Sequence, residues 1–444
     1  MSIVASAGSA FALGETIVDV RVVGAVRTDE STVRSIAGLR IGDTLENETL
    51  ALVRERLNTT GLFADVNVWW EARGEGVRVN IAVKDKFPWA PVPTGSWSAN
   101  NKSIGLVFVH GNLFGLGKQL AIGGRLAELD SGAILAYRDP ALFQTWMYWE
   151  LKAIYQRQIM PEYDANMLVP LSPYRQTTYD AFGIEPAFGV AWFRRVRTQV
   201  SWRLDKVNYK NTEYFNDTGM LDPTIMGPPS TKGGYVGIGK AAVAFDWRAR
   251  EQAVMHGMAL GGNLDIGSPA FGSDFKFWRA AAFWEQGIRI FRRHNLIYSG
   301  GATFGHNLPV WLDPVSGGPN LRGYLVQQFR GDSQLSAKVE YHFPLFSIGS
   351  LDIRGLGFYD TSAVWFRELP PLDPVTGYRI RPDGDMRTFS PLVSPGLDTN
   401  RDLHNDVGAG LRFFLRSVAV PLVGFDAGYG LESHKVRFIL VVGA

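Results

Sequence analysis

Residues 334–343 read Gln-Leu-Ser-Ala-Lys-Val-Glu-Tyr-His-Phe, and apolar and polar side chains alternate along the whole stretch. Leu335 and Val339 share one face, whereas Lys338 and Glu340 share the other. A period of two residues with an apolar face and a charged face suits a transmembrane strand that has lipid outside and water inside. The same pattern suits a soluble sheet with one wet face. How often the pattern recurs along the chain therefore decides between the two fold classes.

The composition of the chain favours the membrane alternative. Its 444 residues include 49 Gly, 27 Phe, 15 Tyr and 13 Trp, spread in short strand-like runs. Aromatic residues at two membrane interfaces and glycines in a curved wall are typical of transmembrane barrels. No stretch approaches the roughly 18 consecutive apolar residues of a membrane-spanning helix. If the protein spans a membrane, it does so as a closed barrel, because closure is then the only way to satisfy every backbone group.

The charged and reactive residues exclude several classes of function. The 45 basic and 43 acidic residues nearly balance, so nucleic-acid binding has little support. Without cysteine the chain has no disulfides and no thiol chemistry. Its seven histidines lack metal-ligand spacing, and residues 398–402 begin like a calcium loop without the glycine and glutamate that such a loop needs. We expect no enzyme activity, no metal and no cofactor.

Residues 1–12 are small and apolar and end in Ala10-Phe11-Ala12, which is similar to a signal-peptidase site. A positively charged start is missing. We interpret residues 1–12 as the remnant of a secretory signal peptide whose beginning lies upstream. The alternative is a disordered N-terminus.

Residues 14–86 predict a small mixed domain of helices and strands. β-Branched residues at 17–23 favour a strand, and residues 28–31 supply N-cap chemistry for a short helix that stops at Gly38. The other expected elements are a helix over 47–58 and two strands over 63–71 and 77–83, joined by a tight turn at 73–76.

The pattern of residue types along the sequence changes after residue 86. The segment 87–96 contains Pro88, Pro91 and Pro93, which cannot continue a central strand, so we predict a stiff linker there. Residues 97–444 predict an all-β transmembrane barrel of about 16 antiparallel strands, each of roughly 10 residues. The longer irregular stretches expected as extracellular loops are 160–173, 211–231, 307–320 and 368–405.

Two motifs resemble the superfamily of outer-membrane assembly and translocation barrels that includes BamA and TamA. Residues 105–117, Gly-Leu-Val-Phe-Val-His-Gly-Asn-Leu-Phe-Gly-Leu-Gly, are similar to the first barrel hairpin of that superfamily. Residues 321–324, Leu-Arg-Gly-Tyr, resemble its V/L-R-G-F/Y motif. The second resemblance implies that a loop around 305–333 folds back into the barrel lumen.

Two further motifs follow in the order of the superfamily. Glu340, followed by Pro344, resembles its E-x-x-x-P run. Residues 358–362, Phe-Tyr-Asp-Thr-Ser, resemble its F-x-D-x-G strand, with Ser362 in place of the usual glycine. Four motifs in the right order make the resemblance far more specific than any one of them.

The order strand, helix, helix, strand, strand within residues 14–86 resembles a POTRA domain, a periplasmic module that binds extended polypeptide by strand addition. Gly42-Asp43 between the helices and Gly61-Leu62 before the second strand add to this resemblance. It implies that the strand starting at Phe63 is an exposed edge. The client-binding residues would be Phe63, Val66 and Val68.

The lumenal motifs also have a rationale of their own. An arginine carried into a barrel by a loop must satisfy five donors, and two inward carboxylates are suitable acceptors. We predict that Arg322 pairs with Asp360, with Glu340 nearby, and so pins the loop inside the barrel. The alternative is that all three are solvated lumenal residues without specific pairing. The complete predicted site, called the lumenal lock, comprises Arg322, Gly323, Tyr324, Glu340, Phe358 and Asp360.

The resemblance leaves two main classes of function open. In the first, the protein is an insertase: its first strand (103–110) and last strand (435–442) form a weak seam where a client strand adds. In the second, it is a translocation pore of the two-partner-secretion type. Such pores usually carry two POTRA domains and a plug helix, so one POTRA-like domain favours the insertase; a passive channel is a third alternative. The predicted seam residues are Gly105, Leu106, Val107, Phe108, Val109, Val436, Phe438 and Leu440.

The expected location is the bacterial outer membrane, with the POTRA-like domain in the periplasm. Expected partners are unfolded outer-membrane or secreted polypeptides and outer-membrane lipids. Accessory periplasmic proteins or lipoproteins are further candidates, and nucleic acid is not a partner.

Overall fold

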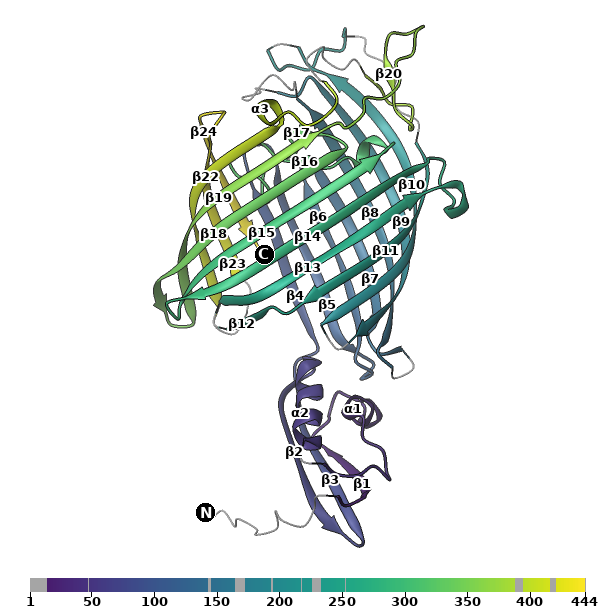
Figure 1. Cartoon of the computed structure of the whole chain (residues 1–444), viewed down its shortest axis with the longest axis vertical. Helices are drawn as coiled ribbons and strands as arrows, with labels where there is room; N and C mark the ends of the chain where they lie inside the picture. Colours follow the sequence, from purple (N-terminus) through teal and green to yellow (C-terminus); the bar gives the residue numbers. More distant parts are fainter. Residues whose placement is uncertain are drawn as a thin grey trace. The chain divides into compact units, whose positions relative to one another are not determined.

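The computed structural model of the chain contains a small α/β unit and a β-barrel (Figure 1). No α-helix in the described part of the chain is long and apolar enough to cross a membrane. The described residues are 14–46, 48–142, 145–163, 172–192, 195–216, 218–225, 233–251, 253–387, 394–415 and 421–443.

The small unit is a three-stranded sheet with two helices. Its strand order is β1-β3-β2, in which β1 is parallel to β3 and β2 is antiparallel to β3. Asp29 caps the first helix by accepting a hydrogen bond from Ser31 N at 2.7 Å, and Gly38 ends it in the left-handed conformation. The predicted elements are confirmed, and their bounds are β1 (Ile17–Val23), α1 (Glu30–Ala37), α2 (Thr49–Thr59), β2 (Phe63–Arg73) and β3 (Gly76–Asp85).

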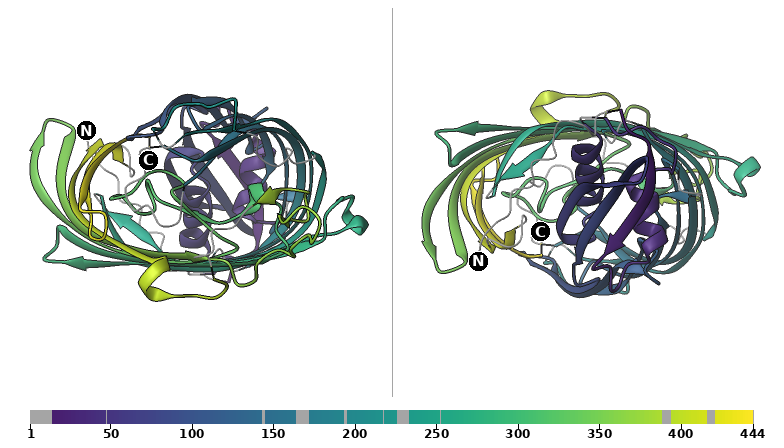
Figure 2. Two further views of the ribbon diagram at one scale, coloured as in Figure 1. Left: turned by 90° about the horizontal axis from the view of Figure 1, so that it is seen from above. Right: turned by 90° about the horizontal axis from the view of Figure 1, so that it is seen from below.

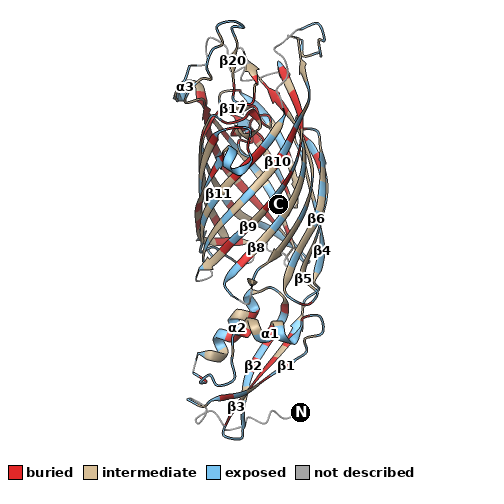
Figure 3. Ribbon diagram, turned by 90° about the vertical axis from the view of Figure 1, so that its right-hand side faces the viewer, coloured by how far each residue is buried: buried red, intermediate tan, exposed pale blue. Residues whose placement is uncertain are grey.

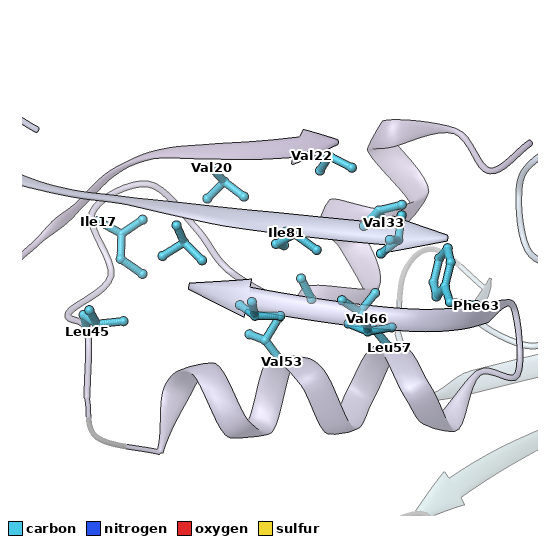
Figure 4. Close-up of a cluster of buried hydrophobic side chains, with 14 of the residues drawn as sticks. Ile17, Val20, Val22, Val33, Leu45, Val53, Leu57, Phe63, Val66 and Ile81 are labelled. Atoms are coloured by element: carbon cyan, nitrogen blue, oxygen red, sulfur yellow. The ribbon is translucent and has the colours of Figure 1, made fainter. Parts of the chain in front are cut away.

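One apolar core holds the small unit together. Alternate residues of all three strands point to the same face of the sheet, where Val33 of α1 and Leu57 of α2 pack with them (Figure 4). Ile17, Val33, Leu57 and Ile81 are completely buried. The spacing of these apolar residues, two in strands and three to four in helices, accounts for the fold of this unit.

Sixteen described strands, apart from the three-residue β12 (Ala249–Glu251), close into an antiparallel barrel. The predicted fold class of this part is confirmed. The strands are β4 (Trp89–Trp97), β5 (Lys102–Leu113), β6 (Lys118–Ala127), β7 (Asp130–Asp139), β8 (Met147–Glu162), β9 (Arg175–Trp192), β10 (Val196–Tyr214), β11 (Gly234–Asp246), β13 (Val254–Gly267), β14 (Phe277–Ile290), β15 (His294–His306), β18 (Ser333–Ile348), β19 (Leu351–Trp365), β22 (Leu403–Leu415), β23 (Pro421–Gly430) and β24 (Lys435–Val442).

The two ends of the barrel differ. The even number of strands brings the start of β4 and the end of β24 to one end, where turns such as β14–β15 and β18–β19 are short. The connections β8–β9, β10–β11, β15–β18 and β19–β22 lie at the other end and are long, as predicted. Met160 to Glu162 and Asn211 to Tyr214 belong to strands, however, because strand pairing continues beyond the last apolar repeat.

The alternation that opened the sequence analysis is present in β18. Leu335 and Tyr341 are 40% and 36% exposed on the outer surface, whereas His342 is buried. Exposed and less exposed residues alternate along the strands (Figure 3). Placing an arginine on the outer face, as in Val339→Arg, should destabilise a lipid-embedded barrel by roughly 2 to 4 kcal/mol. The lumenal change Lys338→Gln should cost little; equal effects on heat-modifiable gel mobility would contradict the assignment of the two faces.

The predicted linker at 87–96 is wrong. Residues Trp89–Trp97 form β4, the first barrel strand, so the barrel begins before residue 97. Pro91 and Pro93 do not prevent this, because β4 is a terminal strand that pairs with β24 at only three residue positions. Proline is excluded from central strands but not from a strand with a largely unpaired edge.

A candidate site in the barrel lumen

The loop between β15 and β18 carries Arg322 and crosses the interior of the ring of strands (Figure 2). A short ladder between β16 (Val315–Ser316) and β17 (Phe329–Arg330) closes its base. Gly317 and Gly318 have φ angles of 113° and 65°, which suit glycine and allow the sharp turn that leads into the tip. Leu321 N donates to Gly318 O at 3.1 Å, so the tip itself is a tight turn.

Arg322 contacts the carboxylates predicted for it. Its Nε and Nη2 donate to the two oxygens of Asp360 at 2.7 and 2.8 Å, which is the bidentate arrangement that favours arginine. Its Nη1 lies 2.7 Å from Glu340 Oε1. The guanidinium also lies over the ring of Phe358, 3.4 Å from the ring centroid. The fold therefore brings these four residues together in one place.

The Arg322 side chain is only 3% exposed, so its charge depends on its partners. Burial opposes the charged form, but hydrogen bonds to Asp360 and the charges of Glu340, Asp360 and Asp426 outweigh it. The pKa of Arg322 is consequently raised above its usual value. Removing either partner of such a buried pair is costly, because the other charge is left unpaired.

Gly323 and Tyr324 hold the tip against the other side of the site. Gly323 N donates to Asp406 Oδ2 at 2.8 Å. Tyr324 is 2% exposed; its hydroxyl donates to Glu432, and the same oxygen lies 3.3 Å from Asn405 O. Burial raises the pKa of the Tyr324 phenol above its usual value, so the hydroxyl remains a donor.

Gly428 and Gly430 of β23 leave room for the backbone of the loop tip, and this pair is called the glycine seat. A Cβ on Gly428 would lie 2.6 Å from Arg322 C, and one on Gly430 would lie 3.1 Å from Gly323 O. In the opposite direction, a Cβ on Gly323 would lie 2.5 Å from Gly430 N. The backbones approach this closely only because none of the three positions has a side chain.

Sequence reasoning missed four charged residues of this site, which are Asp406, Arg412, Asp426 and Glu432. Asp426 Oδ2 lies 3.2 Å from Arg322 Nη1, and Asp426 also accepts two hydrogen bonds from Arg412 at 2.6 and 2.8 Å. Asp406 is paired directly across the sheet with Asp360. Asp406, Arg412 and Asp426 could have been found from the alternation of small and charged residues over 406–412 and 426–430. This alternation is the same inward pattern as in β18.

A second cluster of buried charges, here called the outer latch, ties the loop between β19 and β22 to the lumenal loop. Arg381 Nη1 donates to Asp313 Oδ2 at 2.9 Å, and its Nη2 donates to Leu308 O at 2.7 Å. Arg175 of β9 bridges Glu162 of β8 at 2.7 Å and Asp385 at 3.1 Å. The side chains of these five charged residues, which are Arg175, Arg381, Glu162, Asp313 and Asp385, are at most 5% exposed.

An apolar cluster adjoins the outer latch, because Leu308 belongs to this cluster and its carbonyl accepts a hydrogen bond from Arg381. The ring of Trp311 lies 6.2 Å from that of Tyr179, 5.8 Å from that of Tyr209 and 5.6 Å from that of Phe275. The inward faces of β8 to β11 are therefore apolar here, against the expectation of a uniformly wet lumen. The buried wall residues of this cluster are Met160, Tyr179, Ala181, Val207, Val236 and Ile238.

The first and last barrel strands pair one strand away from the position expected for the seam. β24 pairs with β4 through Leu440–Trp97, Val441–Ser96 and Val442–Gly95, whereas residues 105–109 belong to β5. Leu440 thus belongs to the pairing of the first and last strands, whereas Gly105, Leu106, Val107, Phe108 and Val109 do not. Val436 and Phe438 pair only with β23 in the described ladders. The first strand was predicted wrongly because residues 87–96 were assigned to a linker. Without β4, β5 became the first strand of the predicted barrel.

The sheet of the small unit has β2 at its edge, as the resemblance implied. The side chains of Phe63, Val66 and Val68 lie in the apolar core and are at most 7% exposed, so they cannot contact a client. Val68 O accepts a hydrogen bond from Arg54 Nη2 at 3.4 Å. What β2 presents at the edge of the sheet is its backbone, not these three side chains.

Comparison with known proteins identifies the family to which this chain belongs. The structure defines the class as a closed antiparallel β-barrel whose lumenal loop carries a charged tip. The profile of the Omp85 superfamily domain matches residues 112–371, and the chain belongs to this superfamily. No curated protein sequence gives a significant match.

Solved structures of the superfamily have the same fold. BamA from Haemophilus ducreyi lacking POTRA domains 1–3 is 14% identical, with a TM-score of 0.65 over 96% of this chain and 84% of that one. CdiB from Escherichia coli is 12% identical, with a TM-score of 0.56 over 98% of this chain and 92% of that one. CdiB from Acinetobacter baumannii is 13% identical, with a TM-score of 0.58 over 96% and 74%. At such identities the likeness concerns the fold.

Proposed function

We propose that this chain is an insertase that assembles β-barrel proteins in the bacterial outer membrane. The observation that carries the proposal is the seam, where β24 and β4 share three residue pairs, against sixteen between β9 and β10. A closure with so few backbone hydrogen bonds is the weakest point of the barrel wall, and opening it exposes two strand edges. A client strand can add to such an edge through its backbone, largely independently of its sequence.

The small unit fits this role as a POTRA domain in the periplasm. The short turns, the start of β4 and the end of β24 lie at one end of the barrel, and such an end is the periplasmic one in outer-membrane barrels. The free edge of β2 offers backbone groups to an extended polypeptide before it reaches the seam. Clients would be unfolded outer-membrane proteins. A translocation pore for secreted polypeptide is the alternative, and a passive channel the third; none of these functions requires catalysis or a cofactor.

The lumenal lock would keep the barrel in one shape while the seam opens. Arg322 joins β18, β19 and β23 through Glu340, Asp360 and Asp426. These ion pairs would therefore hold β18, β19 and β23 in place when β4 and β24 separate at the seam. This role concerns geometry, so its loss should affect assembly more than membrane insertion of the barrel itself.

A cysteine pair across the seam tests the proposal. Ser96 and Val441 are directly paired, and the chain has no native cysteine, so Ser96→Cys with Val441→Cys should form a disulfide without background. We expect the oxidised protein to lose assembly of client barrels in proteoliposomes, and reductant to restore it.

The matched control places the disulfide one strand further into the wall. Val423 and Val442 are paired between β23 and β24, so Val423→Cys with Val442→Cys should form a disulfide that leaves the seam free and assembly intact. Full activity of the oxidised seam variant would rule out lateral entry. If that variant instead still secreted a soluble client, the pore would be the correct function.

A further inference from the structure

The seam between β24 and β4 is paired over only part of its height. Its three residue pairs join positions 440–442 of β24 to positions 95–97 of β4, whereas Val436 and Phe438 of β24 pair only with β23 in the described ladders. This part of β24 lies next to the β23–β24 turn, where β24 begins. An unpaired strand edge is a weak point in the wall of a membrane barrel. Closure of this part of the seam therefore depends on contacts other than the ladder.

Asn100, in the turn between β4 and β5, contacts the lumenal loop. Val326 N donates to Asn100 Oδ1 at 3.0 Å, and Asn100 Nδ2 donates to Val326 O at 3.0 Å. The same Nδ2 also donates to the Tyr163 hydroxyl at 3.2 Å. The amide thus exchanges two hydrogen bonds with the backbone of one residue, as a residue of a neighbouring strand does. This side chain attaches the lumenal loop to the β4–β5 hairpin, on one side of the seam.

Tyr324 attaches the same loop on the other side of the seam. Its hydroxyl donates to Glu432, in the turn between β23 and β24. Tyr324 and Val326 are two residues apart, so their Cα atoms are separated by at most about 7 Å. Residues 324–326, here called the seam strap, therefore connect the two turns that flank the seam and limit how far these turns can separate.

The two ends of the seam strap differ in the strength of their attachment. Two residues before Tyr324, Arg322 contacts three carboxylates of β18, β19 and β23. Asn100 forms neutral hydrogen bonds, which are roughly half as strong as such charge-assisted ones. When β4 moves away from β24, the bonds between Asn100 and Val326 therefore break first.

We propose that the seam strap holds the seam closed, and that release of Val326 from Asn100 is the step that lets β4 separate from β24. This inference rests on the proposed function, because it concerns the regulation of the same seam. Arg322 keeps the loop on the β18–β23 side of the wall throughout. A client strand then adds to the edge of β24 that the ladder leaves without a partner.

Distances between spin labels on the full chain in proteoliposomes test the proposal. Ile104 of β5 and Val436 of β24 are 73% and 56% exposed, and the chain has no native cysteine. Ile104→Cys with Val436→Cys therefore places one label on each side of the seam. In this background we expect Asn100→Ala to raise the ratio of long to short distances about tenfold, because two hydrogen bonds that require the closed seam are lost.

The neighbouring asparagine of the same turn provides the matched control. The side chain of Asn101 accepts from Leu129 N and donates to Asp130, both at 3.2 Å, and these partners lie at the β6–β7 turn on the same side of the seam. Asn101→Ala should therefore leave the distances as in the wild type. An equal increase in Asn101→Ala would overturn the proposal, because general loosening of the turn would then account for the effect.

Asn100→Asp is a second variant that keeps the size of the side chain. It replaces the amide donor with an oxygen that faces Val326 O, so it should also open the seam, while heat-modifiable gel mobility stays that of the wild type. Wild-type distances in either Asn100 variant would overturn the proposal.

The spin labels report on the seam without any client, so this test is separate from the test of the insertase. If the seam disulfide stops assembly while Asn100→Ala keeps wild-type distances, the seam strap is ruled out and the insertase stands. A tenfold increase in Asn100→Ala together with full activity of the oxidised seam variant would support the seam strap and rule out the insertase.

Discussion

Replacing Arg322 with alanine should abolish most of the client assembly while leaving a folded barrel in the membrane. The change leaves Glu340, Asp360 and Asp426 without their shared cation in a buried site. Breaking a buried pair in this way typically costs about 3 to 5 kcal/mol, enough to detach the loop tip from its seat. Arg322→Lys should restore activity only in part, because an ammonium cannot form the two parallel hydrogen bonds to Asp360.

Exchanging the charges of Arg322 and Asp360 tests whether these two residues interact specifically or whether any change in the lumen lowers activity. Arg322→Asp combined with Asp360→Arg should recover more assembly activity than either single change, as a double-mutant cycle would measure. Arg279→Ala is a suitable control, since Arg279 is another lumenal arginine with its own carboxylate partner, Asp265 at 2.7 Å. Strictly additive effects of the two changes would mean that Arg322 and Asp360 do not act together.

Opening the outer latch should raise ion conductance through the barrel. Combining Arg175→Ala with Arg381→Ala leaves Asp313 and Asp385 buried without these cations, and the repulsion and desolvation cost should release the loop between β19 and β22. We expect larger single-channel currents in planar bilayers and greater uptake of bulky antibiotics by cells. The lumenal lock is untouched in this variant, so assembly activity should fall less than in Arg322→Ala.

A control for the outer latch lies two residues away in the same loop. Arg379 donates to Pro370 O at 2.7 Å, a contact within that loop, so Arg379→Ala should leave the conductance unchanged. Wild-type conductance in the double latch variant would show that these ion pairs do not close the barrel. The lumenal Trp311 cluster would then be the main barrier, and Trp311→Ala would be the change to measure.

The sequence by itself determined the class of the barrel, the inward and outward faces of β18 and the central pair of the lumenal lock. A period of two can be read from one strand at a time, and the Arg-Gly-Tyr tip with its two carboxylates came from motifs that each occupy a few neighbouring residues. The elements of the small unit could also be predicted from the sequence, because capping residues such as Asp29 and Gly38 act within one helix.

Only the tertiary structure decided which distant residues meet. Asp406, Asp426 and the glycine seat belong to strands that approach Arg322 because the barrel closes, and neither periodicity nor local motifs encode that closure. The same reason explains the misplaced seam: Pro91 and Pro93 disfavour a strand locally, yet β4 forms because the barrel supplies β24 as its neighbour. The cations of the outer latch likewise gain their partners through contacts between loops, and these depend on how the whole ring of strands is joined.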